Sequence, residues 1–126
     1  MNFCLSQRVN SQFTVDEMKD YSGFVADLLN AGIPALIYAG DVDFICNYLG
    51  NKAWTTELEW NHGDEFKAAL DRPWKINHDD AKPVGLAKSA NGLTFMQVFD
   101  AGHMVPTDQP VVALHLIQNF IKGGTF

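Results

Sequence analysis

One short segment constrains the fold of this chain more than any other. Residues 33–39 are apolar at odd and even positions alike, and Gly40 closes the run. A strand with one solvated face alternates apolar and polar side chains, whereas a strand that is covered on both faces does not. Pro34 is compatible with this interpretation because proline is tolerated among the first residues of a strand. The segment therefore predicts an α/β fold with a partial, mostly parallel sheet and flanking helices.

Helices are predicted on both sides of this strand. Upstream, Thr14-Val15-Asp16-Glu17 has the form of a capping box, in which Thr14 and Glu17 satisfy unpaired backbone donors. Six apolar residues then recur at helical spacing: Met18, Tyr21, Phe24, Val25, Leu28 and Leu29. The sequence Asn-Ala-Gly at 30–32 indicates the end of that helix. Downstream, residues 47–58 are predicted to form a second helix.

The second half of the chain is less regular. Residues 59–91 predict short irregular elements with a hairpin, and Asn91-Gly92 is typical of a hairpin turn that leads into a strand over 93–99. Asp108 is expected to cap a last helix with Pro110 in its first turn, and Gly123-Gly124 to end it. With no repeat and no linker, residues 1–126 are predicted to form a single domain.

Composition excludes several classes of function. The formal net charge is −6 and no basic stripe exists, so nucleic acid is not an expected partner. No apolar run reaches membrane-spanning length, and the first residues lack the apolar core of a signal peptide. The four histidines and two cysteines show no metal-binding spacing, so neither a metal nor another cofactor is expected.

The chemistry is expected in two loops. In open α/β sheets, functional residues follow the carboxyl ends of strands, and here Asp41 and Asp43 follow one strand while His103 follows the next. The order Asp then His matches the last two members of the α/β-hydrolase order Ser, Asp, His. Histidine is a suitable base near neutral pH, and an aspartate fixes its tautomer. The residues alone leave other interpretations open: the aspartates as turn residues, His103 as an ordinary loop histidine, and either aspartate as the acid.

Two longer motifs carry a resemblance to a known family. Residues 38–47, Tyr-Ala-Gly-Asp-Val-Asp-Phe-Ile-Cys-Asn, continuing through 49–55, resemble the acid loop of serine carboxypeptidases. Residues 101–110, Ala-Gly-His-Met-Val-Pro-Thr-Asp-Gln-Pro, resemble the histidine loop of that family. Weaker similarity reaches back to Cys4, Val9-Asn10 and Met18. The resemblance covers most of the chain apart from residues 59–91, but only the C-terminal portion of a family-length enzyme.

The resemblance implies a role for five residues. Asp43 matches the acid of the catalytic triad and His103 its base. Cys46 matches a cysteine near the substrate pocket, and Met104 a pocket residue beside the histidine. Their alternatives are a small buried residue for Cys46 and a core gap-filler for Met104. Cys4 matches a cysteine that forms a disulfide with the N-terminal part of such enzymes.

One departure from the family pattern concerns the nucleophile. A nucleophile elbow requires G-x-S-x-G between a strand and a helix. None of the serines, Ser6, Ser11, Ser22 and Ser89, lies in such a setting. This chain is therefore predicted to be inactive alone, because a base without its nucleophile and oxyanion donors gives no useful hydrolysis.

The expected function is that of the C-terminal segment of an α/β-hydrolase that removes C-terminal residues from peptides. Its expected partners are a peptide substrate and the N-terminal part or heavy chain of the same enzyme, with a homodimer as a further option and no membrane. The resemblance implies a lysosomal, vacuolar or secreted setting. Two alternatives stay open: a non-catalytic α/β interaction domain, and a piece of a related hydroxynitrile lyase.

Overall fold

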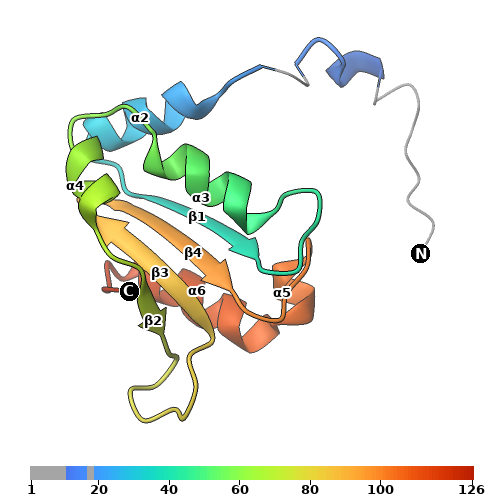
Figure 1. Ribbon diagram of the computed structural model, residues 1–126, viewed down its shortest axis with the longest axis vertical. Coiled ribbons are helices and arrows are strands. Elements are labelled where there is room, and N and C mark those ends of the chain that lie inside the picture. The colour runs from blue at the N-terminus through green and yellow to red at the C-terminus, as the bar shows by residue number, and fades with distance from the viewer. Residues whose placement is uncertain (1–10, 17–18) are drawn as a thin grey trace.

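The computed structural model describes residues 11–16 and 19–126, and its elements form a mixed sheet between two layers of helices (Figure 1). In chain order the elements are α2 (Ser22–Asn30), β1 (Ala35–Gly40), α3 (Tyr48–Thr56), α4 (Gly63–Ala68), β2 (Arg72–Trp74), β3 (Gly85–Ala90), β4 (Leu93–Val98), α5 (Val105–Asp108) and α6 (Pro110–Ile121). The predicted α/β class with flanking helices is confirmed.

The sheet is mixed rather than mostly parallel, which corrects the expectation from sequence. Its order is β1-β4-β3-β2, and β1 runs parallel to β4, from Ala35 opposite Leu93 to Gly40 opposite Val98. The pairs β3–β4 and β2–β3 are antiparallel. The cause is connection length: a tight hairpin can join only antiparallel neighbours, whereas the long segment carrying α3 and α4 lets β4 return parallel to β1.

Helices cover both faces of this sheet (Figure 1). On one side, Leu93 and Phe95 pack with buried residues of α2 and α4, among them Leu29 and Phe66. On the other side, alternate residues of β4 pack against α6, with Met96, Val98 and Leu116 at the centre. Because successive side chains of a strand point to opposite faces, β4 contributes to both cores.

The strand that is buried on both faces is thus β4, not β1. Five of the six residues of β4 are buried, whereas only Ala39 and Gly40 are buried in β1. The reason is position, since β1 lies at the edge of the four-stranded sheet and its Tyr38 side chain is 39% exposed. The apolar run at residues 33–39 therefore has one free side in this chain.

The hairpin at Asn91-Gly92 is confirmed. Both residues have positive φ angles, 47° and 94°, which is the conformation that a two-residue hairpin turn requires. The turn places Ala90 opposite Leu93, and one step further along the ladder the hydroxyls of Ser89 and Thr94 form a hydrogen bond of 2.6 Å. This turn fixes the register of β3 against β4.

Two helix starts differ from the sequence prediction. Helix α2 begins at Ser22, whose backbone N–H donates to Asp20, while the hydroxyl of Thr14 donates to the carbonyl of Ser11. Glu17 and Met18, which belonged to the predicted helix start, lie outside the described residues. At the other end of the chain, Gln109 rather than Asp108 occupies the N-cap of α6.

The start of α3 and the ends of α2 and α6 agree with expectation, whereas α3 ends at Thr56 and not at the predicted Leu58. The side chain of Asn47 caps α3 by accepting a hydrogen bond from the backbone N–H of Gly50 at 2.8 Å. Gly123, with a φ angle of 67°, directly follows the last turn of α6. Among the described residues, no helix combines the length and apolar character needed to cross a membrane.

Gly40 is required where β1 ends. A Cβ atom at this position would lie 2.1 Å from the carbonyl oxygen of Ala101, which is backbone that cannot rotate away. The loops that follow β1 and β4 therefore cross at Gly40, and their backbones lie so close together that residue 40 can carry no side chain.

The first prediction concerns this crossing. Gly40→Ala should lower the free energy of unfolding by about 1–3 kcal/mol, because the added methyl group forces the two loops apart. Gly23→Ala is the matched control, since a Cβ atom there would have no neighbour within 4 Å. Urea unfolding of both variants checks the prediction. Equal unfolding midpoints for Gly40→Ala and Gly23→Ala would contradict it.

Candidate active site

The loops that carry Asp43 and His103 leave the sheet at the same end. Because β1 and β4 are parallel and end at the paired residues Gly40 and Val98, their following loops begin side by side. Two backbone hydrogen bonds continue this pairing past the strands: the N–H of Asp41 donates to Val98 at 2.9 Å, and the N–H of Val42 donates to Ala101 at 3.1 Å. The register of the strands thus positions both loops.

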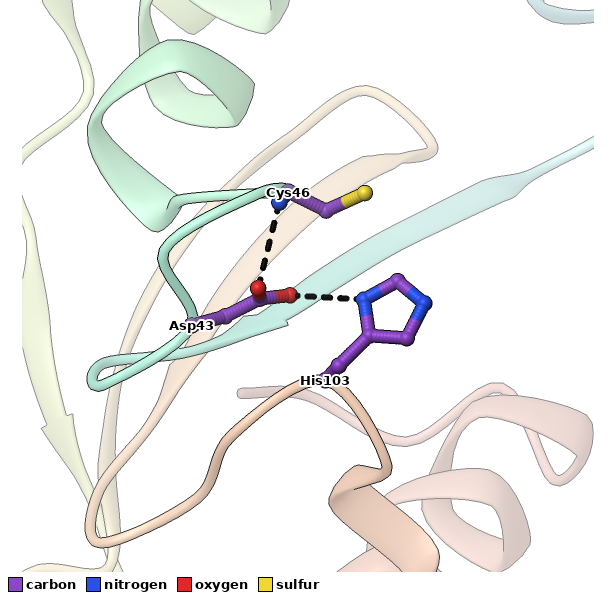
Figure 2. A group of neighbouring side chains, drawn as sticks. All are labelled: Asp43, Cys46 and His103. Carbon is purple, nitrogen blue, oxygen red and sulfur yellow. Dashed lines mark hydrogen bonds and ion pairs between the residues drawn. The ribbon is translucent and has the colours of Figure 1, made fainter. Parts of the chain in front are cut away.

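Asp43 and His103 meet across these loops (Figure 2). His103 Nδ1 lies 3.0 Å from Asp43 Oδ2, although the residues are 60 positions apart in sequence. The other carboxylate oxygen, Oδ1, accepts hydrogen bonds from the backbone N–H groups of Ile45 at 3.0 Å and Cys46 at 3.1 Å. All of these contacts hold the carboxylate of Asp43 in one orientation.

The two side chains differ sharply in exposure. The side chain of Asp43 is 6% exposed and that of His103 is 59% exposed. A buried, fixed acid therefore holds an accessible base. This is the arrangement that lets the imidazole contact another group while its orientation is set from behind.

The electrostatic state of Asp43 follows from its contacts. Burial raises the pKa of its carboxyl group, but the hydrogen bonds from His103, Cys46 and Ile45 and the charge of His103 together outweigh burial, so the pKa lies below its ordinary value of 3.8. Asp43 is therefore a carboxylate near neutral pH and can only accept hydrogen bonds. Nδ1 of His103 must then carry the proton, which leaves Nε2 of the neutral ring as a free base.

Asp108 holds the histidine loop in place. Its Oδ2 accepts a hydrogen bond from the backbone N–H of Gly102 at 2.8 Å, directly before His103. Asp100 in the same loop has a positive φ angle of 54°, and its carbonyl accepts from the side chain of Gln109 at 3.2 Å. The sequence prediction treated Asp108 as a helix cap and missed this role, because the pattern Asp-x-Pro indicates a helix start.

Asn51 does the same for the acid loop. Its Nδ2 donates to the carbonyls of Cys46 and Asn47, both at 3.0 Å, and its Oδ1 accepts from the indole N–H of Trp54 at 3.1 Å. The sequence prediction assigned no role to Asn51. The one feature of the sequence that pointed to Asn51 was its position inside the acid-loop motif.

The remaining predicted site residues are found as follows. His103 forms its hydrogen bond with Asp43 and not with Asp41, whose Oδ1 is buried and has no hydrogen-bond partner among the described residues. Cys46 is an exposed free thiol and Met104 is 57% exposed, so the buried alternatives considered for both are wrong. Their assignment to a substrate pocket stays a prediction. Cys4 lies outside the described residues.

Three side chains at this site offer atoms that can bind a metal ion. One ligand atom each from Asp43, Cys46 and His103 lies within 4.8 Å of the other two, and Figure 2 shows the three side chains gathered at the loops. A cavity of about 700 Å³ lies elsewhere, against Pro34, Gly92 and Phe126. None of these three residues lines that cavity.

Comparison with known proteins finds serine carboxypeptidases among the relatives of this chain. A family model described as serine carboxypeptidase matches residues 3–123. Carboxypeptidase Y of Saccharomyces cerevisiae is 47% identical over 115 residues, which is 91% of this chain and 21% of that protein. A vacuolar serine-type carboxypeptidase of the same yeast is 44% identical over 112 residues, or 89% of this chain and 22% of that protein.

A solved structure shows a similar fold. The crystal structure of a prohormone-processing carboxypeptidase from Saccharomyces cerevisiae superposes with a TM-score of 0.69 at 29% identity, and covers 81% of this chain and 22% of that one. The chain thus spans about a fifth of the length of the relatives that it matches.

The second prediction concerns the acidity of Asp43. His103→Leu keeps the bulk that shields Asp43 but removes a hydrogen bond and a charge, so the pKa of Asp43 should rise. Because the carboxyl group of Asp43 has a lower pKa in the folded chain than in the unfolded chain, its ionised form stabilises the fold. This stabilisation is present above about pH 3.8 and is lost as the pH falls through the lower pKa of the folded state. Titration of the carboxyl carbon by NMR measures the shift.

Asp80 is the internal control for this titration. Hydrogen bonds from Asn77 are the main cause of its lowered pKa, and His103 is not among the causes, so its titration should not change in His103→Leu. A pKa of Asp43 that stays constant in the variant would show that His103 does not control its ionisation.

Proposed function

Because this chain belongs to the serine carboxypeptidase family, we propose that it supplies the acid and the base of a catalytic triad that hydrolyses C-terminal peptide bonds. The observation that supports this most directly is the hydrogen bond of 3.0 Å between Asp43 and His103. The buried carboxylate and the exposed imidazole match what each role requires.

The proposed chemistry follows from the tautomer of His103. Nε2 accepts the proton of a serine hydroxyl as the oxygen attacks the carbonyl carbon of the last peptide bond, and the imidazolium that forms is stabilised by Asp43. The same nitrogen then returns the proton to the leaving amino group, and an acyl-enzyme remains. Water, deprotonated again by Nε2, releases the shortened peptide. No step of this reaction uses a metal ion.

We place the nucleophile outside this chain. Ser22 begins α2 and Ser89 bonds Thr94 within the sheet, so neither occupies the turn between a strand and a helix that an elbow requires. Ser6 and Ser11 lie in a sequence without the G-x-S-x-G pattern. The serine, the oxyanion donors and the groups that bind the terminal carboxylate would come from the N-terminal part or heavy chain of the same enzyme.

The edge of β1 is the proposed contact with that part. β1 has one unpaired side in this chain, and large apolar side chains are exposed in the segments that precede and follow it, including Phe24 and Leu28 of α2 and Phe44 of the acid loop. An unpaired edge beside apolar surface favours pairing with another strand. The homodimer expected as an option would use the same edge.

A vacuolar or lysosomal setting is part of the proposal. It rests on a relative that is itself described as vacuolar and is 44% identical to this chain. The peptide substrate is likewise proposed from the family and not from a pocket in this chain.

The third prediction tests the triad in the assembled enzyme. Asp43→Asn should lower kcat about ten-thousand-fold, because the amide no longer fixes the required tautomer of His103. The matched control is Asp79→Asn, since Asp79 also contacts a histidine, His78 at 3.1 Å, but both side chains are fully exposed. Release of the C-terminal residue from a blocked dipeptide gives kcat for both variants.

The outcome of this comparison separates two explanations. A large loss in Asp43→Asn alone supports the proposed role. An equal, small effect of both substitutions would assign Asp43 to loop structure and leave His103 without its acid.

The fourth prediction concerns the isolated chain. A fluorophosphonate probe, which labels activated serines, should leave the 126 residues unlabelled, because no serine of the sequence stands in a G-x-S-x-G elbow. The assembled enzyme, treated in parallel, should be labelled on its other part. Stoichiometric labelling of the isolated chain, located by mass spectrometry, would overturn the assignment of the nucleophile to another part.

A further inference from the structure

The group formed by Asp43, Cys46 and His103 holds one ligand atom more than an acid–base pair needs. The hydrogen bond between Asp43 and His103 explains why those two side chains lie together. It does not involve the thiol of Cys46, whose side chain nevertheless lies at the same place (Figure 2). Carboxylate oxygen, imidazole nitrogen and thiolate sulfur are the three kinds of atom that bind Zn²⁺ in proteins.

The spacing is close to what a tetrahedral ion requires. Bonds of about 2.0–2.3 Å to Zn²⁺ place neighbouring ligand atoms roughly 3.3–3.6 Å apart. The three ligand atoms here lie within 4.8 Å of one another, so a shift of about an ångström in one or two side chains is sufficient. Cys46 and His103 are both exposed, so neighbouring side chains leave room for this shift, while Asp43 is fixed by the backbone N–H groups of residues 45 and 46.

We propose that Asp43, Cys46 and His103 form a binding site for a borderline-soft divalent cation of the Zn²⁺ class, with water as the fourth ligand. The donor set selects against Mg²⁺ and Ca²⁺, which prefer oxygen ligands alone. The charge also fits, because a carboxylate and a thiolate together neutralise a divalent ion. No other group of three such side chains exists within residues 11–16 and 19–126.

The ion occupies the place of the proton between His103 and Asp43. Nδ1 lies 3.0 Å from Oδ2 and is the ring nitrogen on the carboxylate side. When Nδ1 gives its lone pair to the ion, the ring proton moves to Nε2 through solvent, and the thiol of Cys46 releases its own proton to become the ligand. One proton is released per ion bound, and the ring stays neutral.

This exchange has a consequence that rests on the proposed function. With a proton on Nε2, the outward nitrogen of His103 is a donor and cannot accept the proton of a serine hydroxyl. The ion therefore stabilises the tautomer opposite to the one that Asp43 favours in its absence. Binding of Zn²⁺ switches the acid–base pair off, and removal of the ion restores it.

Binding is tested on the chain itself, with Co²⁺ as the spectroscopic substitute for Zn²⁺. In a Cys4→Ser background, where Cys46 is the only thiol, Co²⁺ should produce a sulfur-to-metal charge-transfer absorption that Zn²⁺ displaces. Cys46→Ser should abolish this absorption. His103→Gln, a change at an exposed side chain, should weaken Co²⁺ binding about 10–100-fold through loss of one ligand. His78→Gln, the exposed control histidine, should bind Co²⁺ as the parent does.

Two results would overturn the site. The first is a Cys4→Ser chain without the charge-transfer absorption. The second is an unchanged affinity in His103→Gln, which would mean that Cys46 binds the ion without the histidine. Because neither measurement needs a nucleophile, both are independent of whether the triad is functional.

A second arm separates the site from its consequence. In the assembled enzyme, Zn²⁺ should inhibit peptide hydrolysis, and a chelator should restore it. If Co²⁺ binds the chain as expected but Zn²⁺ does not inhibit the enzyme, the tautomer switch is wrong and the site stands. If the enzyme is inactive without any ion, the proposed function fails and the binding result is unaffected.

Discussion

The parallel pairing of β1 with β4 is the constraint on which the rest of the structure depends. It places Gly40 beside Val98, so that two loops from distant parts of the sequence start from one edge. A slip of one residue would turn every side chain of β1 to the opposite face and would carry the acid loop with it. The missing side chain at Gly40 lets the two loops cross in contact, and this crossing brings Asp43 within hydrogen-bond distance of His103.

Burial is divided unequally across the site, and the division has a physical logic. A buried carboxylate is costly unless hydrogen bonds compensate for lost hydration. Asp43 receives that compensation from two backbone N–H groups and from His103. The histidine, in contrast, needs access to whatever it contacts, and its loop is held from behind by Asp108 and Gln109. The histidine loop is therefore held by hydrogen bonds from Asp108 and Gln109, and the exposed ring of His103 is oriented by Asp43 and not by surrounding side chains packed against it.

Local signals made part of this structure predictable from sequence. The hairpin turn depends only on the backbone conformations of Asn91 and Gly92, and the cap of α3 depends only on the side chain of Asn47.

The sheet order could not be predicted in this way, because the apolar run at 33–39 does not reveal which neighbour lies on each side of β1. The start of α2 was predicted too early because apolar spacing continues upstream of Ser22, and spacing alone does not mark the residue at which a helix begins. Asp43 and Asp41 were equivalent by pattern; the choice of Asp43 came from the family motif, and the hydrogen bond to His103 agrees with it. The role of Asp108 and the approach of Cys46 to His103 depend on how the loops fold over each other, which spacing along the chain does not encode.

The loop between β2 and β3 lies apart from these contacts (Figure 1). It carries His78 and Asp79, whose side chains are fully exposed, whereas the chain on either side is anchored in one core, by Trp74 before the loop and by Ala87 after it. Lengthening, shortening or recharging this loop leaves the strand ends where they are. The part of this chain that can change in length and charge is thus separate from the part that sets the spacing of Asp43 and His103, which is fixed by the paired ends of β1 and β4.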